Sequence, residues 1–564
     1  MRIRHCFPIT IVITLLPHNA MSNGDGNCAP YPVGMTLGNV TLGNNNVMRG
    51  VSIAVGDPEQ HFAFFPQWPL NNTFVYGIDG HCDDTWSAAG CESFRGGAYN
   101  ESASSTEQDV SNPGSYLTEN PPYPGFSWTA EDLILDEHTT LTNFPLGLPL
   151  ADWGAQGYHP QAAIGLGRNS TILNALYNAG HIASRSWAMW WGRTSGGEEQ
   201  DGSLVFGGFD RARVQEGKKN YTYALDYSNA ECPSGMLITI SDLALNFDNG
   251  TRASLFNETN RAMPACITPD APVLMTMPRD PYFDRFEDIS QRYTQDRSFG
   301  VYFYGLVYPN HARAYTGDLS ITINSEYSVR IFDWELVVPN ININKTTGAL
   351  SANGETPELL INPLQLGNAG ELPELGRQFL TRTYIMLNQD ANTFTLFESR
   401  FDTSQDLVAI DEKNQQVDRF CAATNQKINF ATIGSTSPVS GSGSSPSSNS
   451  TVADDASRDT SDSQPGLGDE GKASMHLSSG VIAGIVVGCA VGVTLVSAVL
   501  FFLRRRATKQ ENRHKSLVIS RPMRPEARYI RNEPPNELAV HNLPPYNPQE
   551  LHSVPISKPP IELP

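Results

Sequence analysis

The chain has 564 residues and is acidic, with 39 Lys plus Arg against 59 Asp plus Glu and a formal net charge of −20. This balance disfavours a nucleic-acid partner. The length exceeds what one simple core needs, so we expect a two-lobed unit with extensions.

The first twenty residues have the pattern of a secretory signal peptide. The charged segment MRIRH precedes the apolar run CFPITIVITLLP, and Ala20 lies at a plausible cleavage point. An uncleaved membrane anchor is the alternative, but the run is short for a membrane span. We therefore expect residues 1–20 to be a signal peptide and the following segment to be extracellular.

Residues 30–432 are expected to form a folded, mostly β head. Short apolar runs rich in β-branched and aromatic residues alternate with Gly, Pro and Asn turns, as in GSLVFGGFD and TRTYIMLNQDANTFTLFES. Two segments instead favour short helices. In NSTILNALYNAG, Ile172 and Leu176 share one face and Gly180 is a stop; in DPYFDRFEDIS, Asp280 is the expected cap and Pro281 opens the first turn.

Cysteines and glycosylation sequons fit an extracellular head. Cys6 lies in the signal peptide and Cys489 in the membrane segment, which leaves six cysteines for three disulfides. Cys82 with Cys91 is the local pairing. The other four, Cys28, Cys232, Cys266 and Cys421, allow three connectivities. Nine Asn-x-Ser/Thr sequons predict glycosylation; they are Asn39, Asn71, Asn100, Asn169, Asn220, Asn249, Asn257, Asn344 and Asn449.

The C-terminal part predicts a stalk, a membrane span and a tail. Residues 433–479 are rich in Ser, Gly, Thr and acid and cannot bury a core, which favours a flexible stalk. Residues 481–503 are 23 residues without a charge, where about 20 suffice to cross a membrane. The arginines at 504–506 place the C-terminal side in the cytoplasm. Residues 504–564 form a proline-rich tail, predicted to be disordered.

Three short features in these segments suggest partners. Glycines repeat every fourth residue in and before the span, which favours helix dimerisation, with lipid-facing glycines as the alternative. They are Gly480, Gly484, Gly488 and Gly492. The LPPY motif, Leu543, Pro544, Pro545 and Tyr546, hints at a WW-type partner. The basic segment 504–515 suits anionic lipid, although stopping translocation also explains it.

The order and spacing of several segments resemble the pepsin-like aspartic peptidases. These segments are VGDPEQ, AAIGLGRNSTILNAL, GSLVFGGFD, VLMTMP and LPELGRQFLTRTYIMLNQDANTFTLFES, and GGAYNESASST is similar to a surface turn of that family. The resemblance covers nearly all of the head. It implies a mainly β, bilobal acid-protease fold, with lobes at about 30–215 and 216–432.

Activity in that family requires two D-T-G-[ST] loops, one in each lobe. Two carboxylates about 3 Å apart cannot both ionise, so they share a proton, and the pair activates water and protonates the substrate carbonyl. The glycine allows a tight turn, and the hydroxyls orient the carboxylates. Loss of one carboxylate removes the shared proton.

Both loops depart from this pattern. In VGDPEQHFAFFPQWPLNNTFVY, the alignment places Gln67 at the first aspartate and Trp68 and Pro69 at the Thr and Gly. Gln has no proton to share, and Pro fixes φ where Gly is needed. In ACITPDAPVLMTMP, Pro269 falls on the second aspartate, and a slip of one residue would put Asp270 there. The alternative for Asp270 is a solvated loop residue.

No other segment supplies the missing chemistry. Asp84 in DDTWS lies in the Cys82–Cys91 loop, Asp402 follows the last hairpin, and Asp459 belongs to the stalk. The histidines lack metal-ligand spacing, no nucleotide fingerprint is present, and no hydrolase triad is supported. We therefore expect no metal and no cofactor. A glycan on Asn71, within the former catalytic loop, would obstruct a cleft there.

These features predict a single-pass type I membrane glycoprotein of the plasma membrane or secretory pathway. The extracellular head is expected to be a catalytically inactive peptidase-like domain that binds a peptide or cell-wall ligand in its cleft. One alternative is an atypical aspartic-type endopeptidase that uses Asp270, and another is a structural cell-surface sensor that needs no cleft. The overall organisation resembles fungal cell-surface proteins.

Overall fold

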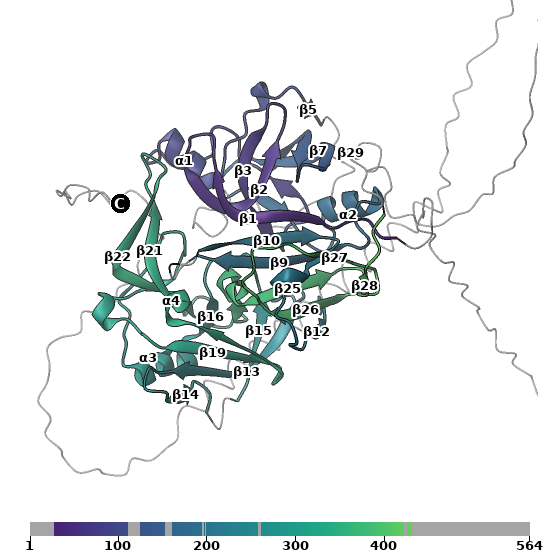
Figure 1. Cartoon of the computed structure of the whole chain (residues 1–564). Helices are drawn as coiled ribbons and strands as arrows, with labels where there is room; N and C mark the ends of the chain where they lie inside the picture. The colour runs from purple at the N-terminus through teal and green to yellow at the C-terminus, as the bar shows by residue number, and fades with distance from the viewer. Residues whose placement is uncertain are drawn as a thin grey trace, which may run out of the picture. The chain divides into compact units, whose positions relative to one another are not determined.

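A 14-stranded sheet runs through both halves of the chain (Figure 1). The computed structural model describes residues 28–110, 125–152, 161–194, 197, 199–257, 261–421 and 426–430. All of them belong to one compact unit. Strands dominate over helices in these residues, which confirms the expectation of a mainly β head. The order of the sheet is β12 (Tyr221–Ala224), β26 (Thr393–Glu398), β25 (Thr383–Asn388), β9 (Ser186–Arg193), β10 (Gln200–Phe206), β1 (Val33–Thr41), β2 (Val47–Val55), β3 (Gln60–Gln67), β8 (Ala163–Gly165), β4 (Thr73–Phe74), β7 (Thr139–Pro149), β6 (Phe126–Ile134) and β5 (Gln108–Asp109), with β29 (Gln426–Asn429) beside β7.

The first-half end of this sheet curls into a partial barrel. Ala54 and Val55 at the end of β2 pair with Ile134 and Leu133 of β6, although β6 lies near the far end of the strand order. This pairing brings the sheet round on itself, and the side chains that face inward form the core. They include Phe62, Phe64, Leu133 and Phe144.

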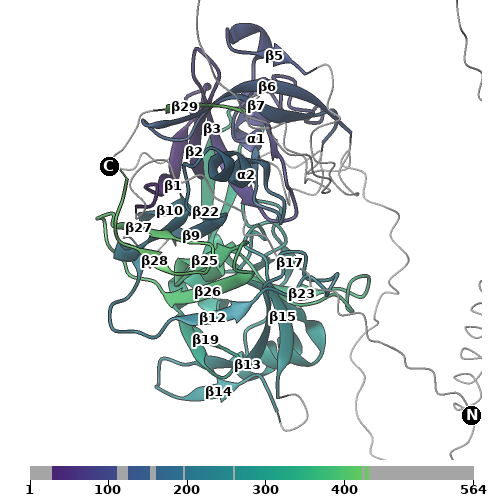
Figure 2. The ribbon, with the colours of Figure 1, turned by 90° about the vertical axis from the view of Figure 1, so that its right-hand side faces the viewer.

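Three smaller sheets belong mostly to the second half. Figure 2 shows strands of the large sheet, β9, β25, β26 and β12, between the barrel and the sheet that contains β13, β15 and β19. An eight-stranded sheet has the order β20 (Tyr327–Ile331), β19 (Asp318–Ile323), β13 (Leu237–Asn246), β15 (Met263–Ile267), β24 (Glu374–Leu375), β16 (Met275–Pro278) and β23 (Ile361–Leu364), with β14 (Arg252–Ser254) beside β13. A four-stranded sheet has the order β17 (Asp296–Arg297), β18 (Leu306–Val307), β22 (Leu350–Leu359) and β21 (Val337–Ile343). A three-stranded sheet has the order β11 (Gly208–Asp210), β27 (Leu407–Ile410) and β28 (Gln416–Val417).

Each half contains the same crossed arrangement of strands around a loop. In the first half, β8 is parallel to β3 and antiparallel to β4, while β4 is parallel to β7. In the second half, β24 is parallel to β15 and antiparallel to β16, while β16 is parallel to β23. The loops 68–72 and 268–274, which follow β3 and β15, therefore occupy corresponding places.

The helices are short and lie on the sheets. The helix expected in NSTILNALYNAG is confirmed as α2 (Thr171–Asn178), which Ser170 caps by accepting a hydrogen bond from the Leu173 backbone. α1 (Ala88–Arg95) was not expected; the Ser87 side chain accepts from the Gly90 backbone at its start. α4 (Asp333–Leu336) is a single turn.

The other expected helix begins later than its sequence pattern indicates. α3 (Asp284–Ser290) follows a π-type turn over Arg279–Phe283. Asp280 is extended within that turn, with φ −97° and ψ 127°, so the prediction that it caps the helix is wrong. The physical reason is Pro281, because the residue before a proline is pushed out of the helical region.

The described residues contain three disulfides. The predicted pair Cys82–Cys91 is confirmed. The remaining cysteines join as Cys28–Cys421 and Cys232–Cys266, one of the three connectivities that the sequence left open.

A long hairpin joins the second half to the first. We call β21, β22 and their connection the clasp; Figure 1 shows it extending to α1. The Ser87 backbone N–H donates to the Lys345 carbonyl (2.9 Å), and its hydroxyl donates to the Thr346 carbonyl (2.6 Å). Asn46 donates to the Thr347 carbonyl at 2.8 Å. The clasp therefore ties the two halves together away from the large sheet.

Several predictions concern residues outside those that the structure describes. They are the signal peptide, the stalk, the membrane span with its glycine repeat, and the tail with its LPPY motif. Among the described residues, no helix is long and apolar enough to cross a membrane.

Candidate functional site at the two corresponding loops

The first loop begins at a buried glutamine. Gln67 is the last residue of β3, pairs with Gly165 of β8, and is 1 % exposed. Its backbone carbonyl accepts a hydrogen bond from Leu166 (2.9 Å), but its side-chain Oε1 has no partner among the described residues. Trp68 follows and packs edge-on against Trp187, with ring centroids 4.7 Å apart. The side chains at the start of this loop are therefore buried in the interior of the head and do not face solvent.

The rest of the first loop supports the start of α2. The Asn71 side-chain oxygen accepts from the Asn169 backbone (3.0 Å), and the Asn71 carbonyl accepts from Thr171 (2.8 Å). The Leu70 carbonyl accepts from Gly167 at 2.7 Å. Asn71 is half-buried, so its side chain has a structural task whether or not its sequon carries a glycan.

The second loop holds a buried aspartate. Its chain turns at once, since the Ala271 N–H donates to the Thr268 carbonyl (2.9 Å). Asp270 within this turn is 4 % exposed. The interpretation of Asp270 as a solvated loop residue is therefore wrong, because the surrounding strands enclose the loop. Burial, and then the nearby Glu374 carboxylate, raise the pKa of Asp270 to about 7.

The two loops correspond closely but differ in length. Counting forward from the β3–β8 and β15–β24 pairings sets Gln67 opposite Pro269. Counting back from the β4–β8 and β16–β24 pairings sets Gln67 opposite Thr268. The second loop is thus one residue shorter, and neither count places Asp270 opposite Gln67.

An arginine lies at the junction of the two halves. Arg377 lies two residues after the end of β24, and its backbone N–H donates to the Ala271 carbonyl (2.9 Å). Its guanidinium lies 4.5 Å from the Phe65 ring centroid and 5.2 Å from that of Trp191, both in the first half. Arg49 adds a second cation by donating to the Trp191 carbonyl at 2.7 Å. Cations and aromatic rings therefore fill this junction.

This arrangement limits what Asp270 can do. A single carboxyl with a pKa near 7 can accept or donate a proton at neutral pH. The shared-proton mechanism, however, needs a second carboxylate about 3 Å away. The charged side chains that shift the pKa of Asp270 are Glu374 and Arg377, and both come from the second half. The first loop contributes a glutamine.

Another buried carboxyl lies at the base of the clasp. Glu358 of β22 is fully buried, and burial raises its pKa to about 8. The Ser298 hydroxyl is near enough to oppose this shift, but neither carboxyl oxygen has a partner in hydrogen-bond geometry among the described residues. Tyr302 is also buried, and burial raises its pKa. The charge of Glu358 adds to this shift, and those of Arg377 and Arg49 oppose it. The segment ETPELL gave no signal for this cluster, because its members are far apart in sequence.

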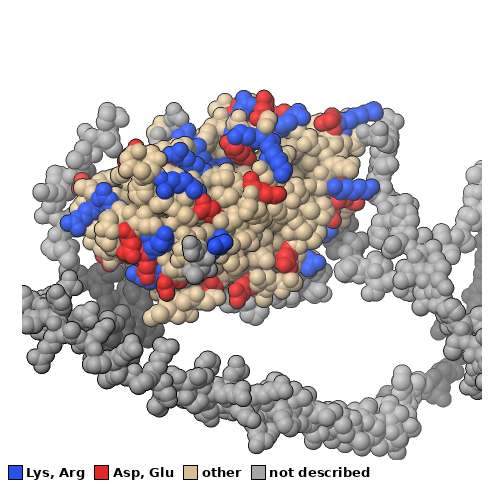
Figure 3. Space-filling view, turned by 90° about the horizontal axis from the view of Figure 1, so that it is seen from below, with Lys and Arg blue, Asp and Glu red and all other residues tan. Residues whose placement is uncertain are grey.

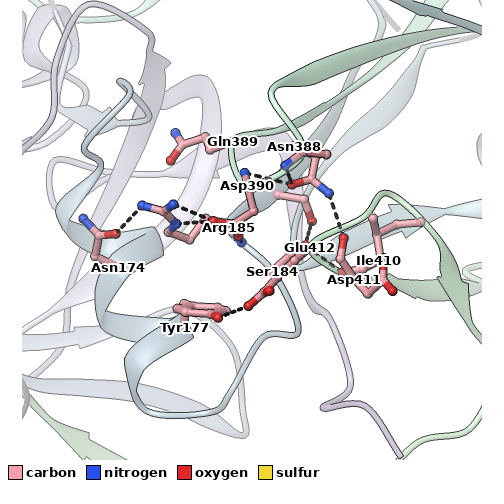
Figure 4. Close-up of polar contacts among 12 residues, drawn as sticks. Asn174, Tyr177, Ser184, Arg185, Asn388, Gln389, Asp390, Ile410, Asp411 and Glu412 are labelled. Atoms are coloured by element: carbon pink, nitrogen blue, oxygen red, sulfur yellow. Dashed lines mark hydrogen bonds and ion pairs between the residues drawn. The ribbon is translucent and has the colours of Figure 1, made fainter. Parts of the chain in front are cut away.

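In a polar pocket beside α2, the lining side chains already form hydrogen bonds with one another. The pocket has a volume of about 430 Å³. Arg185 donates to both Asp390 and Asn174, and Tyr177 donates to Glu412 (Figure 4). Burial, and then the hydrogen bond to Glu412, raise the pKa of Tyr177 to about 12. Because these groups bind one another, we interpret them as contacts that hold α2 against the turns after β25 and β27.

The remaining predicted site residues lie apart from the loops. Asp84 is exposed, and Asp402 is held by Ser404 and Arg400. Asp459 and Asn449 lie outside the described residues. Asn100, like Asn71, is half-buried, whereas the other described sequon asparagines are exposed; these are Asn39, Asn169, Asn220, Asn249, Asn257 and Asn344. Within the described ranges, no group of His, Cys, Asp and Glu could hold a metal.

Charges of both signs are interspersed on the face that carries α3 and β14 (Figure 3). The described part of this face has no continuous basic stripe of the kind that binds nucleic acid.

No protein-family model matches the chain, and no curated protein matches it at a significant level.

Proposed function

We propose that residues 30–432 form a pepsin-like, bilobal domain with lobes at about 30–215 and 216–432. The support is the repeated crossing of strands, in which β3, β4, β7 and β8 correspond to β15, β16, β23 and β24. Each repeat presents one loop at the same place, as a two-loop active site requires. Three of the family segments quoted above contain strands of these repeats: AAIGLGRNSTILNAL contains β8, VLMTMP contains β16, and the start of LPELGRQFLTRTYIMLNQDANTFTLFES contains β24.

On this basis, the head is a catalytically inactive relative of the aspartic peptidases. The observation that carries this proposal is that Gln67, which the sequence alignment sets at the first catalytic aspartate, is buried at the end of β3. A glutamine amide neither shares a proton nor acts as a base on water. Arg377 adds a cation at the same junction. The role left to the head is binding of a peptide or wall ligand at the cell surface, on a single-pass, glycosylated type I chain.

One observation favours proteolysis as the second candidate. Asp270 is buried in the loop of the second half, and its pKa of about 7 is strongly perturbed, as is common for catalytic groups. An atypical aspartic-type endopeptidase would use this carboxyl alone.

Incubation of the full-length chain with denatured haemoglobin, at several pH values from acid to neutral, tests these candidates. The pseudoenzyme is expected to produce no cleavage above that of a matched Asp270→Ala preparation. Cleavage that pepstatin blocks and that Asp270→Ala abolishes would overturn the proposal.

A further inference from the structure

A pocket of about 500 Å³ opens in the second half, apart from the two loops. This volume lies within the range of about 300–1,000 Å³ typical of small-molecule sites. It is formed by the end of α3, the segment after it and the hairpin of β17 and β18. Its lining residues are Arg279, Glu287, Tyr293, Thr294, Gln295, Asp296, Arg297, Phe299 and Leu306.

Two aromatic side chains of this lining are unusually exposed. Tyr293 is 52 % exposed and Phe299 is 66 % exposed. The Phe299 ring meets Phe303 and Tyr304 edge-on, with centroids 5.9 and 5.7 Å apart, so its orientation is fixed by neighbours. Exposed aromatic faces held in place beside a pocket favour a ligand that covers them.

The pocket also holds an immobilised hydrogen-bond donor. Arg297 donates to the Asn362 side chain and to the Pro363 carbonyl (3.1 Å), and its guanidinium lies 5.3 Å from the Tyr304 ring centroid. These contacts fix the side chain before any ligand arrives. A ligand that binds to it therefore loses little of its affinity to side-chain ordering.

The charges of the lining cancel. Arg279 and Arg297 are offset by Glu287 and Asp296, and Arg279 is already paired with Asp284 at 3.3 Å. A strongly charged ligand would meet both signs, whereas a neutral, polar ligand would find donors and acceptors on the same wall.

We propose that this pocket binds a neutral saccharide. A sugar ring combines C–H faces, which pack on aromatic rings, with hydroxyl groups, which pair with planar charged and amide side chains. Tyr293 and Phe299 supply the first kind of contact, and Arg297, Glu287 and Gln295 supply the second. The site is separate from the loops at Gln67 and Asp270, so it goes beyond the function proposed above and does not depend on lost catalysis.

Titration calorimetry of the full-length chain in detergent tests this site with four neutral hexasaccharides as probes: β-1,3-glucan, β-1,4-glucan, chitin and α-1,6-mannan. We expect at least one to bind, and we expect Phe299→Ala and Tyr293→Ala each to weaken that binding by about tenfold or more. Phe299→Leu keeps an apolar side chain but removes the flat ring, so it should weaken binding without changing the thermal midpoint.

Tyr31→Ala is the matched control, because Tyr31 has the same exposed fraction of 52 % and is absent from the pocket lining. It is expected to bind as the parent chain does. The proposal is overturned if none of the four probes binds at millimolar concentration, if the pocket variants retain full affinity, or if Tyr31→Ala loses as much as they do. Binding of a denatured-protein peptide, but no saccharide, in a Phe299-dependent manner would equally overturn it.

Discussion

Gln67 and Asp270 lie in corresponding loops but differ in what they can do with a proton. The Gln67 amide cannot titrate, so its burial requires no proton uptake. Asp270 is enclosed beside Glu374 and Arg377, and its raised pKa indicates that the folded chain holds the neutral acid through most of the acidic range. The two loops therefore carry one titrating carboxyl between Gln67 and Asp270.

Asp270→Asn should change how stability depends on pH. The unfolded pKa is the ordinary 3.8 and the folded pKa is about 7. Between these values the folded state holds a proton that the unfolded state has released, so stability falls as pH rises, and the penalty remains above pH 7. Asparagine does not titrate. We expect the variant to be more stable than the parent by about 1–3 kcal/mol at pH 8, and close to it at pH 4.

Chemical unfolding of the full-length chain at both pH values measures this difference. Gln67→Glu is an informative companion, because it places a carboxyl where the first loop buries an amide, and it should destabilise more at pH 8 than at pH 4. A lower stability of Asp270→Asn at pH 8 would contradict the prediction and indicate that Asp270 is ionised and paired with Arg377.

At the scale of elements, the clasp depends on a close backbone approach at α1. A Cβ atom on Gly90 would lie 2.0 Å from the Lys345 carbonyl oxygen, which is an impossible contact. Ser87, one turn earlier, supplies the two hydrogen bonds that hold the same carbonyl region. The helix end and the hairpin tip are thus shaped for one another.

Gly90→Ala should therefore open the clasp. In an ordinary helix interior this change stabilises by about 1 kcal/mol, because glycine costs backbone entropy. Here the clash with the Lys345 carbonyl outweighs that gain. Trypsin cleavage after Lys345 should accelerate by about fivefold or more, since each ~1.4 kcal/mol lost in closing raises the open population about tenfold.

Gly367→Ala provides the control, because no heavy atom lies within 4 Å of a Cβ at Gly367. Its digestion should match that of the parent chain. If Gly90→Ala resisted trypsin as well as the parent, the hairpin tip would be held by something other than its contact with α1.

The sequence pattern predicted those helices and strands whose formation depends on residues close together in the chain. The α2 helix follows from apolar spacing and the Ser170 cap, and the strand before Gln67 follows from its short run of apolar and aromatic residues. The sequence could not reveal the burial of Asp270, because Arg377 and Glu374 lie about a hundred residues away and reach it only through the pairing of β24 with β15. The clasp likewise depends on contacts between distant segments, and Arg297 of the pocket is held by Asn362 and Pro363.

At the scale of the whole molecule, the ends of the described head are joined. The Ala29 N–H donates to the Arg419 carbonyl (2.8 Å), the Cys421 N–H donates to the Ala29 carbonyl (2.9 Å), and Cys28–Cys421 closes the contact. The large sheet also crosses between the halves, because β9 pairs with β25. Because both links join the two halves, we expect the halves to unfold as one body.

The three disulfides should therefore differ in the stability that they supply. They join residues 393, 34 and 9 positions apart, for Cys28–Cys421, Cys232–Cys266 and Cys82–Cys91 respectively. A bridge that closes a longer loop removes more freedom from the unfolded chain, by about 6, 4 and 2.5 kcal/mol in the chain-entropy model. Replacing each pair by serines should lower the free energy of unfolding in that order. Denaturant midpoints with unchanged slopes would measure it. A larger loss for the Cys82–Cys91 pair than for Cys28–Cys421 would contradict the prediction and show that the docking of α1 against the clasp outweighs chain entropy.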